Sequence, residues 1–174
     1  MFNVKMDKIQ ESIQKAQTDP AAVQVKMNLE GNWRMDEMQP QFGGKVKLPS
    51  GEEVLFESDF PPFLGGKGVK PSPLQYCFWG GMACYASTFM LVAVAEKVEI
   101  KNLTVKTTGL IDFHQALGLS DAPPIQGLTW EVQVEADASQ QELDRLNELA
   151  EERCPASWML KNIVPFTAKV VKKL

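Results

Sequence analysis

The feature that most constrains this chain is a long segment without a charged side chain, which runs from Pro71 to Ala95. It opens with Ser72-Pro73-Leu74-Gln75, in which Ser suits a helix N-cap, Pro the first helical position, and Gln completes a capping box. We therefore predict one long helix that ends near Glu96. A helix that is apolar on all sides is buried on all sides, so we expect a sheet to cover one face and a partner subunit to cover another.

A segment of this length could also span a membrane. It contains several polar residues and two adjacent glycines, Gly80 and Gly81, and the sequence offers no second spanning candidate. We therefore favour a core helix and predict that the protein has no membrane partner.

The composition is that of one globular domain, with 174 residues, 44% hydrophobic and 23% charged. The net charge is −4 and the charges are interspersed, so no basic surface is offered to nucleic acid. The N-terminus is charged and lacks the apolar core of a signal peptide. Three cysteines are too few for a disulfide framework. These features predict a cytoplasmic protein without a nucleic-acid partner.

The rest of the chain alternates between strand and helix patterns. An amphipathic helix is predicted over about residues 6–16, within an N-terminal helical appendage of residues 1–22. A capping box at Ser139 predicts a helix that ends near Arg153, and a Pro/Gly-rich loop over 59–71 is expected to be exposed or to line a cleft. Together these patterns indicate an α+β domain over residues 23–174 with antiparallel strands. Alternating or β-branched segments predict strands over 23–29, 45–48, 53–56, 98–108, 128–135 and about 164–171.

The cysteines are the candidate reactive groups. Cys154 precedes Pro155 at the predicted N-cap of a short helix, where free N–H groups favour a thiolate and lower the pKa; it could equally be a small residue tolerated before proline. Cys84 lies within the long helix, where a thiol is inert by default and mostly protonated at neutral pH. Cys77 is predicted to lie in the core. A zinc site formed by the three cysteines and His114 lacks the usual spacing, so we expect no metal.

Several segments together resemble the OsmC/Ohr family, whose names refer to osmotic induction and organic hydroperoxide resistance. They are Pro73-Leu74-Gln75 with Ala83-Cys84 further along the helix, the Val-Glu-Ile-Lys-Asn-Leu-Thr-Val strand that starts at Val98, and Glu151-Glu152-Arg153-Cys154-Pro155. The resemblance covers about residues 23–171. It implies antiparallel sheets wrapped around long central helices in an intertwined homodimer, with two active sites at the subunit interface.

The resemblance also implies a reaction. Cys84 falls on the position of the peroxidatic thiolate, which attacks an organic hydroperoxide, and Cys154 on that of the resolving cysteine, which forms a disulfide with the resulting sulfenic acid. A dithiol reductant then restores both thiols, without a cofactor. The implied function is the reduction of lipophilic hydroperoxides in oxidative-stress defence. The apolar side chains expected to suit such a substrate are Tyr76, Phe78, Trp79, Met82 and Phe89.

One departure from the family pattern leaves a second function open. Active members hold an Arg beside the thiolate with a Glu placed just after the proline that opens the helix, and here that position is Leu74. Arg34 is where one branch of the family carries its Arg, so it is the candidate thiolate partner. Without the carboxylate, the alternative is an OsmC-fold dimer with weak or no peroxidase activity that binds a small molecule or senses redox state.

Overall fold

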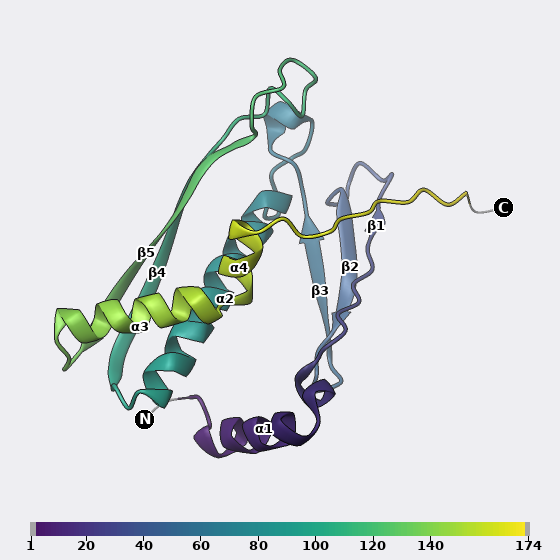
Figure 1. The fold of residues 1–174 in the computed structure, drawn as a ribbon. Coiled ribbons are helices and arrows are strands. Elements are labelled where there is room, and N and C mark those ends of the chain that lie inside the picture. Colours follow the sequence, from purple (N-terminus) through teal and green to yellow (C-terminus); the bar gives the residue numbers. More distant parts are fainter. Residues whose placement is uncertain (1–2, 173–174) are drawn as a thin grey trace. The chain divides into compact units, whose positions relative to one another are not determined.

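The computed structural model describes residues 3–172 and contains two compact units. The N-terminal unit is Lys5–Gly80, and the C-terminal unit runs from Gly81 onward. Helix α2 (Pro73–Ala95) begins in the first unit and continues into the second. Figure 1 shows the order of the elements along the chain. Each unit is described by itself.

Helix α2 forms as the sequence predicts. The Gln75 N–H donates to the Ser72 hydroxyl at 3.3 Å, and the Ser72 N–H donates to the Gln75 side-chain oxygen at 2.8 Å. Within the described residues, α2 is the one helix long and apolar enough to cross a membrane, a test that core helices of soluble proteins also pass. Trp79 is 62% exposed on it, and Leu91 is also exposed. The described chain therefore does not cover α2 on every side.

The C-terminal unit is a long hairpin packed against helices. Strands β4 (Ile100–Ile111) and β5 (Ile125–Ala136) pair antiparallel along their length, and α3 (Gln140–Arg153) and α4 (Pro155–Lys161) follow. A two-stranded hairpin is marginal alone and needs a helix on its apolar face, which α2 and α3 supply here (Figure 1). The buried residues of this core are Tyr85, Phe89, Val92, Ala93, Leu146, Ala150, Cys154 and Ala156.

The N-terminal unit contains a small antiparallel sheet in the order β1-β2-β3. After α1 (Met6–Thr18) and a 3₁₀ turn η1 (Pro20–Val23), the strands are β1 (Asn32–Trp33), β2 (Phe42–Lys47) and β3 (Glu53–Ser58). The turn that joins β2 to β3 contains Gly51 at a φ of 93°, where a side chain would be strained. Neighbouring residues in a strand point to opposite faces, so Glu57 and Ser58 serve different sides of this sheet.

The Pro/Gly-rich loop, which includes the 3₁₀ turn η2 (Pro62–Leu64), is held in place by Asp59. Asp59 is 3% exposed, and its carboxylate accepts the N–H groups of Lys67 at 3.1 Å and Val69 at 3.3 Å. A Cβ at Gly66 would lie 1.9 Å from the Phe60 carbonyl oxygen, so only glycine fits. The loop lines a cavity of about 380 Å³, as the sequence predicts.

Three predictions about local structure are wrong. The strands predicted over residues 23–29 and about 164–171 are not formed. A half-buried strand needs a neighbouring edge to supply hydrogen bonds and cover, and neither segment finds one in the described chain: Val25 is 86% exposed and Phe166 is 89% exposed. Cys77 is exposed rather than in the core.

The core of the C-terminal unit gives a test of this fold. Leu146 on α3 is 1% exposed, so Leu146→Ala should lower the free energy of unfolding by about 3 kcal/mol through lost burial and the remaining cavity. Leu110→Ala, at a 63% exposed position of β4, should change it by less than about 0.5 kcal/mol. Denaturant unfolding at one fixed protein concentration measures both. Equal effects of the two substitutions would contradict the assigned core.

Candidate functional site: a cysteine pair

Two cysteines far apart in the sequence meet in the C-terminal unit. The sulfur of Cys84, on α2, lies 3.8 Å from the sulfur of Cys154, between α3 and α4, and both are free thiols. A disulfide needs about 2.05 Å, so the sulfurs are in contact without being bonded. The fold therefore brings together the two cysteines that the sequence singles out.

The backbone around Cys154 explains how it is placed. Its N–H donates to the Ala150 carbonyl at 2.9 Å and its carbonyl accepts the Trp158 N–H at 2.9 Å, so it ends α3 and begins α4. Its φ of −76° and ψ of 119° are extended, as expected for a residue before proline. The α3 helix and the α4 helix thus meet at this one residue, which confirms the predicted N-cap position.

Tyr85 fixes the other side of the pair. Its hydroxyl donates to the Asn147 side-chain oxygen at 2.6 Å, which ties α2 to α3 one residue away from Cys84. Burial, followed by the nearby charges of Glu151 and Cys154, raises the pKa of Tyr85 to about 12. Tyr85 is therefore a neutral hydrogen-bond donor at physiological pH, and the contact it makes is structural.

Cys154 is 0% exposed, yet its surroundings favour the thiolate. Burial alone would raise the pKa of Cys154, but the backbone N–H and hydroxyl of Ser157, the Cys84 thiol and the Ala156 N–H together bring it below the ordinary value. These groups face the sulfur without forming a regular N-cap hydrogen bond. Arg153 is exposed and is not among the groups that lower the pKa.

Cys84 has the opposite tendency. Burial raises the pKa of Cys84, the Ala156 N–H lowers it, and the neighbouring Cys154 raises it further through the shared hydrogen bond and its charge. The net pKa is above the ordinary value. Within the described chain, Cys154 is therefore the thiol that ionises first, and Cys84 keeps its proton.

Ser157 is a residue that the sequence reasoning missed. It is 4% exposed, and both its backbone N–H and its hydroxyl favour the Cys154 thiolate. The spacing in the sequence could have indicated Ser157, because it stands three residues after the predicted N-cap, and the residue at that position faces the cap side chain.

Arg34, the candidate thiolate partner, pairs with a carboxylate within the N-terminal unit. Arg34 donates from Nη1 to Oε1 of Glu57 at 2.6 Å, and Lys70 lies 2.8 Å from Oε2 of the same residue. Hydrogen bonds from Lys70 and then Arg34 lower the pKa of Glu57. The sequence reasoning missed Glu57, since only the pairing register of β1, β2 and β3 places it near Arg34.

Gly43 makes this ion pair possible. Arg34 follows β1, Glu57 lies on β3, and β2 runs between these strands. The Gly43↔Glu57 pairing puts Gly43 beside the path of the guanidinium, and a Cβ there would lie 2.6 Å from Arg34 Nη2. Arg34 thus crosses β2 at a position without a side chain. Its predicted pairing with Cys84, which belongs to the other unit, stays a prediction.

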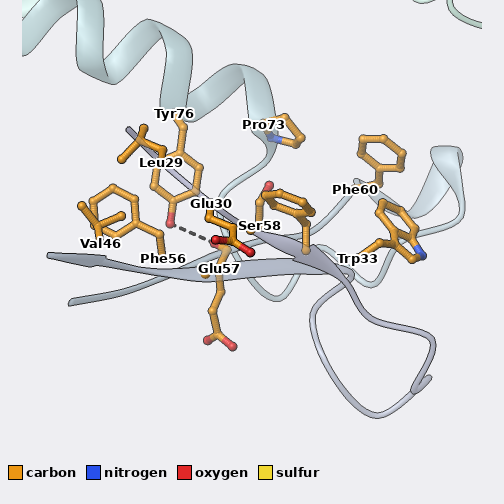
Figure 2. A pocket seen from close by; sticks show the side chains of 13 residues that line it. Leu29, Glu30, Trp33, Val46, Phe56, Glu57, Ser58, Phe60, Pro73 and Tyr76 are labelled. Atoms are coloured by element: carbon orange, nitrogen blue, oxygen red, sulfur yellow. Dashed lines mark hydrogen bonds between the residues drawn. The ribbon is translucent and has the colours of Figure 1, made fainter. Parts of the chain in front are cut away.

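The opposite face of the same sheet lines an apolar cavity of about 490 Å³. Figure 2 shows Phe56 and Tyr76 side by side in it, with the Glu57 carboxylate pointing away to the other side of the sheet. The Tyr76 hydroxyl donates to the Glu57 carbonyl at 2.8 Å, and its ring stacks on Phe56. The Ser58 hydroxyl is buried and has no partner among the described residues.

The apolar side chains expected around the peroxide do not form one pocket within either unit. Tyr76 lines the cavity in the N-terminal unit, Phe89 is buried in the core of the C-terminal unit, and Trp79 is exposed. Among residues 3–172, no group of three or more His, Cys, Asp or Glu side chains is arranged to hold a metal.

The chain thus combines antiparallel sheets with a long helix that carries one member of a reduced cysteine pair. The chain belongs to the OsmC family of OsmC-like proteins, whose profile matches residues 65–169. The predicted family and the α+β OsmC-like fold are thereby confirmed.

Solved structures agree with this assignment of the fold. An organic hydroperoxide resistance protein from Legionella pneumophila is 19% identical, with a TM-score of 0.57, covering 79% of this chain and 92% of that one. An osmotic stress and detoxification protein from Psychrobacter arcticus is 16% identical, with a TM-score of 0.58 and coverages of 82% and 91%. A hydroperoxide resistance protein from Vibrio cholerae, with captopril in one active site, is 19% identical, with a TM-score of 0.51 and coverages of 80% and 88%. No curated protein sequence matches the chain.

The crossing at Gly43 can be tested directly. In Gly43→Ala, the new methyl group should push the guanidinium of Arg34 away from Glu57, because the present gap is too small for a Cβ. Glu57 should then lose one of its two cationic partners, and its carboxyl should titrate at a higher pH in a carbon-detected NMR titration. Gly80→Ala, where a Cβ meets nothing within 4 Å, is the matched control and should leave this titration unchanged. A Glu57 titration that is the same in Gly43→Ala and the wild type would refute the proposed crossing.

Proposed function

We propose that the protein is a two-cysteine thiol peroxidase that reduces organic hydroperoxides in the cytoplasm as part of oxidative-stress defence. The observation that carries this proposal is the 3.8 Å separation of the Cys84 and Cys154 sulfurs. Membership of the OsmC family supports it, as do the names of structural neighbours that are hydroperoxide resistance proteins. No metal or organic cofactor is needed for this chemistry, since sulfur supplies the electrons.

The reaction begins at Cys84, which is the more exposed thiol of the pair. Its thiolate attacks the terminal oxygen of the hydroperoxide ROOH, the O–O bond breaks, and Cys84 becomes a sulfenic acid while the alkoxide takes a proton to give ROH. The Cys154 thiolate then attacks the Cys84 sulfur, and hydroxide leaves and is protonated to water. The product is a Cys84–Cys154 disulfide, and a dithiol reductant returns both cysteines to thiols.

The charge around the pair limits the first step. Only a thiolate attacks the peroxide, and the raised pKa of Cys84 keeps most of this thiol protonated in the described chain. A cation near its sulfur would correct this. Arg34 is our candidate, oriented by Glu57 in place of the family carboxylate. If the guanidinium of Arg34 does not reach the Cys84 sulfur in the folded protein, we expect slow reduction of hydroperoxides.

We also propose that the protein acts as a homodimer. Exposed apolar side chains on segments with strand-like alternation support this, since Val25 is 86% exposed and Val170 is fully exposed in one chain. Trp79 on α2 and Trp158 on α4 are also more than half exposed. A single subunit rarely leaves so much large apolar surface in water, and a second copy would cover it.

Single-cysteine variants test the peroxidase. With cumene hydroperoxide, the wild type should form the Cys84–Cys154 disulfide, seen by nonreducing peptide mapping. Cys84→Ser should reduce peroxide consumption to the uncatalysed level, because the attacking sulfur is gone. Cys154→Ser should stop at a Cys84 sulfenic acid that dimedone traps. Cys77→Ser, which alters an exposed cysteine on the same helix, is the control and should behave as the wild type. Undiminished peroxide consumption by Cys84→Ser would rule out the proposed peroxidase.

A second candidate function is the binding of a small apolar molecule, and the cavity of the N-terminal unit favours it. Its lining is almost wholly apolar, and it holds one buried hydroxyl, that of Ser58, without a partner. A buried hydroxyl without a hydrogen bond is costly, and a ligand with one polar group could satisfy it. The cavity thus fits a compact apolar or aromatic molecule that carries a single hydrogen-bonding group.

Fluorescence of N-phenyl-1-naphthylamine, which has such a shape and one N–H group, tests this candidate. Ser58→Ala should weaken its binding roughly three- to tenfold, the value of one hydrogen bond, while the protein stays folded because an unsatisfied polar group is removed. Leu55→Ala, on the opposite face of β3, is the matched control and should bind as the wild type. Binding that is equal in all three proteins would refute the proposed hydrogen bond between the ligand and Ser58.

A further inference from the structure

The two sulfurs of the pair differ in how they can be reached. Cys154 is 0% exposed, whereas Cys84 is only partly buried. A molecule that approaches from solvent therefore meets the Cys84 sulfur first. Thiol–disulfide exchange requires direct contact between the attacking sulfur and the sulfur under attack. The sulfurs lie 3.8 Å apart and would move together by less than 2 Å to form the disulfide. Because this movement is small, the same difference in access applies to the disulfide.

We propose that the reductant opens the disulfide at Cys84, with Cys154 as the leaving group and Ser157 as the residue that stabilises it. This inference rests on the proposed two-cysteine reaction and assigns each sulfur a separate role in its second half. The thiolate of a dithiol attacks the Cys84 sulfur, a mixed disulfide forms there, and the Cys84–Cys154 bond breaks with its electron pair left on Cys154. The second thiol of the reductant then attacks the reductant sulfur that is bonded to Cys84. Cys84 is released as a thiolate, which takes a proton, and the reductant leaves as its cyclic disulfide.

The surroundings of Cys154 suit a leaving group. The Ser157 hydroxyl, the Ser157 N–H and the Ala156 N–H favour negative charge on this sulfur, and the pKa of Cys154 is correspondingly lowered. Exchange is faster when the departing thiol has a low pKa. Cys84 lacks the Ser157 contacts, and its own pKa is raised. When Cys154 is the leaving group, the negative charge is left on the better stabilised sulfur. The exposure of the two cysteines and their electrostatics therefore both favour attack at Cys84.

The inference also restricts the reductant. Its reactive sulfur needs to reach a partly buried cysteine on α2, and a second thiol on the same molecule needs to follow it. A small or extended dithiol meets both requirements. A monothiol should stop at the mixed disulfide or require a second molecule, which makes a monothiol the appropriate trapping reagent.

The site of attack can be mapped without any peroxide. The wild type is oxidised with diamide, exposed briefly to glutathione, quenched with acid, alkylated with N-ethylmaleimide and digested. We expect glutathione on the Cys84 peptide and N-ethylmaleimide on the Cys154 peptide. Glutathione on Cys154, or on both cysteines equally, would overturn the inference, as would failure of diamide to join the two sulfurs. Because diamide replaces the hydroperoxide, a protein that exchanges at Cys84 but consumes no peroxide would refute the proposed function alone.

Variants of Ser157 test the leaving group. Ser157→Ala should slow reduction of the diamide-formed disulfide by dithiothreitol roughly three- to tenfold, because one hydrogen bond to the departing thiolate is lost. It should also move the titration of Cys154 to higher pH, followed by thiolate absorbance in a Cys77→Ser, Cys84→Ser background. Ser87→Ala is the matched control, since that exposed hydroxyl on α2 bonds to the Ala83 carbonyl. A Ser157→Ala variant that keeps both the rate and the titration of the wild type would remove Ser157 from this role.

Discussion

The packing of α2 against α3 brings the two cysteine sulfurs of the C-terminal unit into contact. Phe89 and Leu146 are each 1% exposed at the centre of this core, and the Tyr85–Asn147 hydrogen bond ties the two helices together beside Cys84. Protein interiors are close-packed, so helices joined in this way have little freedom to slide. The sulfur separation is therefore a consequence of core packing. The residues next to each cysteine in the sequence do not by themselves bring the two sulfurs together.

The charge distribution of the pair follows from what each sulfur faces. Cys154 begins a helix and meets N–H groups and a hydroxyl, whereas Cys84 lies within a helix whose own N–H groups are already bonded to its carbonyls. Burial opposes ionisation at both, but only Cys154 has enough donors to overcome it. A cation or a dipole that reached Cys84 would favour its thiolate and draw the charge towards the less buried residue of the pair.

The sequence predicts those elements whose signals are local. The capping boxes at Ser72 and Ser139 and the proline after Cys154 predict helix starts that the structure confirms, since a cap depends only on residues within one turn. The segments 23–29 and 164–171 fail for the complementary reason. Alternation indicates that one face of a segment is apolar. A strand also needs a neighbouring strand edge to pair with, and the sequence pattern does not show whether one is present.

The same limit applies to the site residues. Cys84 and Cys154 could be named from the family resemblance, and Cys154 also from its cap position. Glu57 and Gly43 could not, because they join Arg34 only through the register of a three-stranded sheet. A shift of one residue in that register would turn Glu57 towards the apolar cavity and Ser58 towards Arg34.

The ion pair and the lining of the cavity therefore both depend on the same strand register. Glu57 and Ser58 are neighbours on β3, and alternation sends the carboxylate to Arg34 and the hydroxyl to the cavity. Tyr76 fixes this arrangement from α2, because its hydroxyl bonds to the carbonyl of Glu57 and its ring packs on Phe56. The Tyr76 hydrogen bond thus joins the lining of the cavity to the backbone of the residue whose carboxylate pairs with Arg34 on the opposite face of the sheet.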